Sequence, residues 1–217
     1  MKTTPAVMLV LLVYSGAISA QSIPSWSVKA GYNQFRPQVR SGDITGVPGG
    51  KVDVSDGGEV FGSVTYALSE QVSTELAFGI PPKLDIIGQG SIGMAGKIAN
   101  TKVWAPVLML QYQLGNPDST LRPYLGVGVT YTRYRQVTTT PVLSMLTNPG
   151  GHTSATIDNA WGAVAQAGIT CPFHANWFLD AAVVPMRVKT TARLSTGQRV
   201  KVSVDPVLVN LAIGLRF

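Results

Sequence analysis

The chain of 217 residues carries a formal net charge of +6, yet charged residues make up only 13% of it and hydrophobic residues 45%. Charged residues usually account for about a quarter of a globular chain, and beyond the N-terminus no apolar run approaches the ~18 residues of a membrane-spanning helix. The composition therefore disfavours a helical membrane protein and leaves two classes, a soluble β-domain with a large core or a β-barrel with an apolar exterior in lipid.

The first 20 residues are predicted to be a secretory signal peptide. Lys2 supplies the positive end, residues 6–14 the apolar centre, and residues 15–20 a run of mostly small residues. We expect cleavage after Ala20, with Ser19 and Ala17 as alternatives, so that residues 21–217 form a single domain in an envelope or extracellular space. The one cysteine, Cys171, leaves that domain without an internal disulfide.

Apolar and polar residues alternate with a period of two from residue 26 to the C-terminus. In residues 122–134, for example, Leu125, Val127 and Val129 alternate with Gly126 and Gly128. This period is typical of β-strands. Eight segments show it: residues 26–33, 60–68, 72–80, 106–114, 122–134, 160–171, 177–188 and 199–217.

The connections between these segments alternate between short and long. The links after the second, fourth and sixth segments are three to seven residues long, whereas those after the first, third and fifth are much longer and rich in Gly, Pro, Thr and Asp. Outer-membrane barrels have short periplasmic turns and long extracellular loops, and an even number of strands. The sequence therefore predicts an all-β fold, an eight-stranded antiparallel transmembrane β-barrel.

The final segment raises two expectations. Because every backbone N–H and C=O group must pair within lipid, this segment is expected to close against the first. Its valines change phase at Asp205 and Pro206, since Val204 lies on one phase and Val207 on the other. An extra residue reverses the direction of side chains and proline cannot donate to a ladder, so a β-bulge is predicted here.

Several stretches together resemble the OmpW family of small outer-membrane barrels, some of whose members help alkanes and aromatic hydrocarbons enter the cell. The most specific are "RPYLGVGVTYT" (122–132), "WGAVAQAG" (161–168) and "VDPVLVNLAIGLRF" (204–217); residues 72–86, 96–114, 159–169 and 176–181 extend the similarity. The terminal Phe217 also resembles the signal by which bacterial outer-membrane proteins are delivered to the insertion machinery. The resemblance implies an outer-membrane location and uptake of hydrophobic molecules.

The sequence departs from the family at positions that affect the lumen. Leu84 stands where the family often has a histidine, and residues 103–106 read "VWAP" where it often has "HLPP". Ala77 and Val184 align with bulky apolar residues that narrow the lumen of some members. These two positions predict a less constricted bore, which leaves the substrate open.

An eight-stranded barrel has little interior space, so a wide aqueous pore is not expected. The inward faces are mixed, which suggests an apolar upper funnel above a polar plug, or else simple packing of the bore. The predicted polar set is Lys29, Glu75, Gln111, Gln113, Gln166 and Asp180, and the apolar path contains Ala77, Met109 and Val184.

Two further features of the sequence are predicted to belong to this path. Leu143, Met145 and Leu146 lie in the long loop 136–158, where an apolar patch forms either the mouth of the funnel or a cover folded over the rim. Pro185 and Pro206 interrupt the last two segments, and we expect them to break the ladder where a ligand leaves sideways.

Two functional hypotheses remain open on the sequence. The first is passive uptake of small hydrophobic molecules with lateral release into the membrane, and the second is a structural or surface-interaction barrel with a filled lumen. The expected partners are outer-membrane lipids and lipopolysaccharide, a small hydrophobic ligand and the insertion machinery. The scattered positive charge forms no basic stripe with aromatics, so nucleic acid is not expected, and we expect no enzyme activity, metal or cofactor.

Overall fold

The computed structural model describes residues 26–116 and 119–217, so the predicted signal peptide lies outside the described residues. Within these ranges no helix combines the length and the apolar character needed to cross a bilayer. The elements are β1 (Trp26–Arg36), β2 (Val39–Ser41), β3 (Gly50–Val54), β4 (Gly57–Ala67), β5 (Val72–Gly79), β6 (Lys83–Gly90), η1 (Gly93–Ala95), β7 (Lys97–Trp104), β8 (Val107–Gln113), β9 (Arg122–Thr139), α1 (Pro141–Thr147), β10 (Ala155–Ile157), β11 (Ala160–His174), β12 (Trp177–Leu194), β13 (Arg199–Val204) and β14 (Val207–Arg216).

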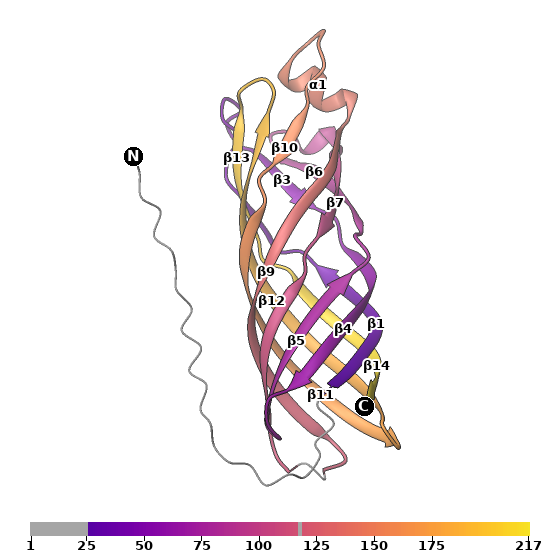
Figure 1. Cartoon of the computed structure of the whole chain (residues 1–217). Helices are drawn as coiled ribbons and strands as arrows, with labels where there is room; N and C mark the ends of the chain where they lie inside the picture. The colour runs from indigo at the N-terminus through magenta and orange to yellow at the C-terminus, as the bar shows by residue number, and fades with distance from the viewer. Residues whose placement is uncertain (1–25, 117–118) are drawn as a thin grey trace, which may run out of the picture.

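Eight of these strands close into an antiparallel ring in the order β1, β4, β5, β8, β9, β11, β12 and β14 (Figure 1). The last strand pairs with the first, and the pairing continues to the C-terminus, where the Phe217 N–H donates to the Trp26 carbonyl oxygen at 3.0 Å. Closure leaves no free edge in the ring, as hydrocarbon surroundings require. The predicted eight-stranded barrel and the predicted closure are therefore confirmed.

A second, smaller set of strands continues the wall beyond the ring; we call it the extension. β9 and β12 are each 18 residues long and run through both parts. In the extension, β7, β6 and β3 follow β9, while β10, β13 and β2 flank β12. Helix α1 lies at the far tip, at the opposite end from the C-terminus (Figure 1). Segments expected to be loops therefore contain five short strands, β2, β3, β6, β7 and β10, while β13 is the first part of the eighth predicted segment.

Aromatic side chains delimit the apolar outer band of the ring. Near the end that holds the C-terminus, the rings of Trp26 and Tyr66 lie 4.7 Å apart. Toward the extension, Tyr131 and Trp161 lie 4.9 Å apart, and the Arg133 guanidinium sits over Tyr131 at 5.7 Å. Aromatic girdles of this kind occupy the two interfaces of a transmembrane barrel, so the band between them is the membrane-spanning part.

The apolar face changes sides where the ring gives way to the extension. On the outer face of β12, Leu179 and Val183 are exposed below the boundary, and Arg187 and Lys189 are exposed above it. On the inner face, Asp180 lies below the boundary, and Val188 is buried above it. Lipid surrounds the lower part and water the upper part, so the two parts carry opposite patterns.

This inversion corrects the bulge predicted at Asp205 and Pro206. Pro185 pairs with Val207 and Val188 pairs with Val204, so two residues separate the pairs on both strands and the register is unchanged. The segment divides into β13 and β14 without an inserted residue. Its valines change phase because the apolar side of the wall is the inside of the extension and the outside of the ring.

Candidate ligand-binding site

The lower lumen is filled by a cluster of polar side chains that we call the polar plug. At its centre the Lys29 ammonium on β1 lies 2.9 Å from a Glu75 carboxylate oxygen on β5 and 3.2 Å from one of Asp180 on β12. All three residues are at least nine-tenths buried. Two carboxylates share one ammonium, so the cluster is held by charge and geometry and is costly to open.

Neutral donors complete the polar plug. The Gln111 amide donates to Glu75 and to the Gln166 side-chain oxygen, the latter at 2.8 Å. Asp180 accepts from the Tyr124 hydroxyl at 3.0 Å and from the Thr170 hydroxyl at 3.2 Å. Five of the six polar residues predicted to point inward thus meet in one network. Gln113 lies outside it and lines a polar pocket that borders Lys29, Gln111 and Asp180 from the short-turn end.

An apolar layer covers the polar plug on its upper side. It consists of Val107, Met109, Tyr124, Val164, Ala182 and Val184, all buried. The ring of Tyr124 belongs to both layers, because its hydroxyl reaches down to Asp180 while its carbon atoms pack among the apolar side chains. The lumen therefore changes from polar to apolar within the span of one tyrosine.

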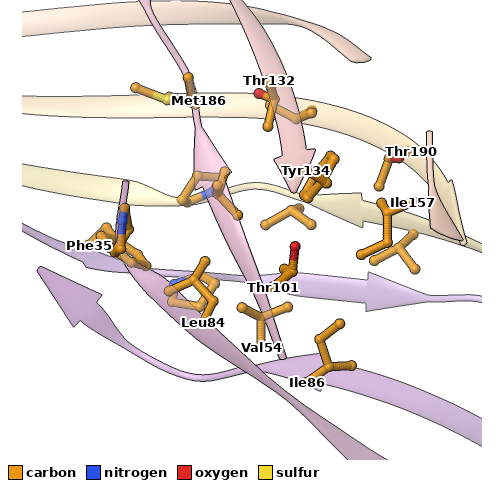
Figure 2. A pocket seen from close by; sticks show the side chains of 18 of the residues that line it. Phe35, Val54, Leu84, Ile86, Thr101, Thr132, Tyr134, Ile157, Met186 and Thr190 are labelled. Carbon is orange, nitrogen blue, oxygen red and sulfur yellow. The ribbon is translucent and has the colours of Figure 1, made fainter. Parts of the chain in front are cut away.

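Above this layer lies a cavity of about 220 Å³, which we call the upper cavity. Its lining runs from Met109 and Val184 at the base to Leu143 and Leu194 in the extension. Figure 2 shows Phe35, Val54, Leu84 and other side chains from several strands around the space. An engineered apolar cavity of ~150 Å³ already binds benzene, so the upper cavity has room for a small hydrophobic molecule.

Four of the six residues assigned to the ligand path line the upper cavity: Ala77, Met109, Val184 and Leu143. The other two do not, which corrects the prediction. Residues 141–147 form α1, which buries Leu143 and Ser144 and leaves Met145 70% and Leu146 47% exposed. The buried side of this short helix carries Leu143 and Ser144, and Met145 and Leu146 lie on its exposed side.

The wall of the barrel is interrupted around the upper end of β5. Two backbone hydrogen bonds join the β3–β4 part of the wall to the β5–β6 part. The Ser55 N–H donates to the Asp85 carbonyl oxygen, and the Ile80 N–H donates to the Val60 carbonyl oxygen, each at 3.0 Å. Between these bonds, the described residues show no backbone hydrogen bond joining 56–59 to 81–84. Pro81 and Pro82 lie in this stretch and have no N–H to donate.

The neighbouring ladder is interrupted at the same level. Pairing between β5 and β8 ends at Ala77 and Val107, and the next bond joins Val103 N–H to the Pro82 carbonyl oxygen at 3.3 Å. Phe78 lies on the outer face between these points and is 47% exposed, yet it also lines the upper cavity. The upper cavity therefore lies directly behind the interrupted part of the wall, and we call residues 78–84 with 56–59 and 104–106 the wall gap.

Pro185 and Pro206 do not break the ladder, contrary to the sequence prediction. The Met186 N–H donates to the Pro206 carbonyl oxygen at 2.8 Å, and the register continues past both prolines. Pro206 lines the upper cavity, while Pro185 faces outward and is exposed. The sequence signal for the actual interruption was the dipeptide Pro81-Pro82 at the end of the third predicted segment.

Comparison with known proteins agrees with this architecture. The sequence model of the OmpW family matches residues 25–217. Outer membrane protein W of Salmonella typhi is 28% identical over 223 residues, covering 100% of this chain and 99% of that protein. The "Dibenzothiophene metabolism operon protein DoxH" of Pseudomonas sp. (strain C18) is 30% identical over 177 residues, covering 79% and 77%.

Among solved structures, the outer membrane protein OprG from Pseudomonas aeruginosa superposes with a TM-score of 0.78 at 24% sequence identity. The match covers 89% of this chain and 95% of OprG. At that identity the likeness establishes the fold, and the sequence relatives establish the family. The chain is an outer-membrane β-barrel and belongs to the OmpW family.

Proposed function

We propose that the barrel takes up small hydrophobic molecules passively, from the extracellular side into the outer membrane, through the upper cavity and the wall gap. The observation that carries this proposal is an apolar cavity that reaches the wall at Phe78 and ends above a charged network. A molecule that enters from the extension meets mostly apolar side chains until it reaches Met109 and Val184.

The polar plug directs the molecule sideways. To pass downward, an apolar molecule would have to separate Lys29 from Glu75 and Asp180, and the separated charges would be left unpaired in a buried site. The wall gap offers a route past Phe78, Pro82 and Leu84 that breaks no charged contact. Outside it lies hydrocarbon, in which an apolar molecule is more stable than in water.

One relative supports the substrate class by its name. DoxH belongs to a dibenzothiophene metabolism operon, and dibenzothiophene is a fused aromatic molecule without a charge. The alternative of a structural or surface-interaction barrel fits the filled lower lumen but gives no role to the upper cavity. Contacts with lipopolysaccharide, and delivery to the insertion machinery by Phe217, remain predictions.

Uptake of a lipophilic dye by intact cells tests the proposal. Ala77 points into the upper cavity on β5, while its neighbour Leu76 points outward and is 47% exposed. Ala77→Trp is expected to reduce uptake to the level of cells without the protein, because the indole fills the space. Leu76→Trp is the matched control and is expected to leave uptake unchanged, since tryptophan is compatible with the lipid face. Equal uptake by wild type, both variants and empty cells would refute the conduit.

Photolabelling tests the lateral route separately. An apolar diazirine equilibrated with the purified barrel in lipid should label residues around Phe78, Pro82 and Leu84. Labelling confined to the polar pocket around Ser73 and Gln113 at the opposite end would instead show passage through the polar plug.

A further inference from the structure

A row of three polar side chains crosses the mostly apolar wall of the upper cavity; we call it the acceptor row. Asn210 on β14 pairs with Asn33 on β1, and Asn33 pairs with Glu59 on β4, so the three residues are consecutive across neighbouring strands. All three line the upper cavity. Glu59 and Arg199 are the charged residues among its described lining residues, and Arg199 lies on the extension.

The hydrogen bond between Asn33 and Glu59 determines which oxygen atoms of the row remain without a partner. The Asn33 amide nitrogen donates to a Glu59 carboxylate oxygen at 3.1 Å, so the Asn33 carbonyl oxygen points elsewhere. Asn33 is 3% exposed, and its carbonyl oxygen has no partner among the described residues. The carbonyl oxygen of Asn210 is also buried and unpaired within the described part of the chain. An ionised carboxylate accepts and cannot donate, so the two unpaired amide oxygens and the Glu59 carboxylate are all able to accept from a donor in the cavity.

In contrast to the polar plug, the acceptor row has few hydrogen-bond donors among the described residues. In the polar plug the Glu75 and Asp180 carboxylates have donors from Lys29, Gln111, Tyr124 and Thr170. Buried polar atoms in native proteins are normally paired, and those left unpaired call for an explanation such as a ligand or water. In the acceptor row the donors have to come from whatever occupies the upper cavity.

The acceptor row also lies beside the wall gap. Glu59 belongs to the stretch of β4 that has no ladder partner on the β5 side. Its carboxyl group lies over Gly79, in the space that a side chain at that position would fill. A molecule that moves from the cavity to the wall gap past Gly79 therefore passes the carboxylate.

We infer that the upper cavity selects apolar molecules that carry one hydrogen-bond-donating head group, a hydroxyl or an ammonium, over pure hydrocarbons and over carboxylates. The apolar part occupies the cavity while the head group donates to the row. A hydroxyl donates its single proton to the unpaired Asn210 oxygen, and an ammonium has further donors for Asn33 and Glu59. A carboxylate would meet acceptors and a like charge. This inference rests on the proposed function, because it names the substrate class of the same cavity.

Competition binding in nanodiscs tests the inference with four ligands of one chain length. The purified full barrel is equilibrated with pyrene, an apolar fluorophore without a donor, and pyrene is displaced by octane, octan-1-ol, octylammonium or octanoate. The readout is the ratio of the half-displacing concentrations of octane and each other ligand. Partition into lipid is the same for every protein variant, so a change in this ratio between variants reports the protein site.

Two variants and one control give the expected differences. Asn210→Leu is expected to lower the preference for octan-1-ol about fivefold to tenfold, the size expected for one hydrogen bond. Glu59→Gln retains an acceptor oxygen and loses the charge, so it is expected to lower the preference for octylammonium more than that for octan-1-ol. Thr101→Val is the control, because the Thr101 hydroxyl lines the cavity but donates to the Arg135 carbonyl oxygen at 3.1 Å.

The outcomes separate this inference from the proposed function. If pyrene and octane bind wild type, and both variants keep wild-type ratios, the acceptor row is satisfied by water alone and the inference is wrong while the conduit stands. If pyrene and octane do not bind the wild-type barrel above empty nanodiscs, the proposed function itself fails. The heat-dependent gel shift of folded barrels verifies that each variant is closed.

Discussion

The two halves of β12 lie in opposite surroundings, and the same strand serves both. In the ring its outer face carries Leu179 and Val183, and its inner face carries Asp180. In the extension its outer face carries Arg187 and Lys189, and its inner face is apolar. The backbone register does not change between them. An alternating pattern therefore identifies a strand, but which phase faces inward depends on the solvent around that part of the wall.

The largest loss of folding stability is expected from removing the Lys29 ammonium at the centre of the polar plug. Lys29→Met leaves Glu75 and Asp180 facing each other without a cation, and breaking a buried pair in this way costs about 3–5 kcal/mol. Urea unfolding of the barrel in lipid measures the loss. Lys189→Met on the outer face of the extension is the control and should change little. Equal stability of wild type and the Lys29 variant would show that the lower lumen does not depend on charge.

A charge on the outer face of the ring should have the next largest effect. Val127 on β9 is 65% exposed in the middle of the apolar band. Val127→Arg is expected to destabilise the barrel by about 2–4 kcal/mol, the range for arginine near the bilayer midplane. The reverse change on the same strand and side, Arg135→Val, should be nearly neutral because the extension faces water. Similar losses in both variants would contradict the boundary drawn at Tyr131 and Arg133.

A smaller effect is expected in the core of the extension. Ile98 on β7 is 3% exposed and packs with Ile44, Leu143, Val200 and Val202. Ile98→Val removes one buried methylene group, which typically costs about 0.5–1.5 kcal/mol. Hydrogen exchange of the extension measures this loss.

Val209→Ala on β14 is the matched control for the Ile98 variant, since Val209 is 51% exposed toward lipid. Lipid fills the space left by its methyl groups, so no cavity forms. If the Ile98 variant exchanges like wild type while Val209→Ala is destabilised, the inside of the extension is not its core.

The sequence predicted the ring better than the extension, for a physical reason. Hydrocarbon permits only paired strands with apolar outer faces, so the segment 72–80 coincides closely with β5 (Val72–Gly79). The strands of the extension are short, and β10 has only three residues. Because water surrounds them, backbone N–H and C=O groups in this part can pair with water, so loops are as acceptable there as strands. The pattern of such segments therefore gives little indication of pairing.

The same distinction applies to the site. Ala77, Met109 and Val184 were placed on the inner face by alternation alone, and they line the upper cavity. The acceptor row was not predicted, because it depends on the register between β14, β1 and β4, which one strand does not reveal. The ladder interruption was predicted at the wrong prolines. Pro185 and Pro206 are single prolines that each remove one donor from a ladder whose register continues, whereas Pro81 and Pro82 remove two donors in succession.

The smallest effect concerns a phenol inside the extension. Tyr134 on β9 lines the upper cavity above the membrane boundary, and burial raises the pKa of its hydroxyl to about 12. A raised pKa means that the neutral phenol is favoured in the folded protein. Its contribution to stability is therefore complete below the ordinary pKa of about 10 and is lost as the pH rises through 12. Difference absorbance of phenolate between wild type and Tyr134→Phe should show one late-titrating tyrosine. A difference spectrum with a midpoint near pH 10 would mean that water reaches this hydroxyl and that the upper cavity is wet at this level.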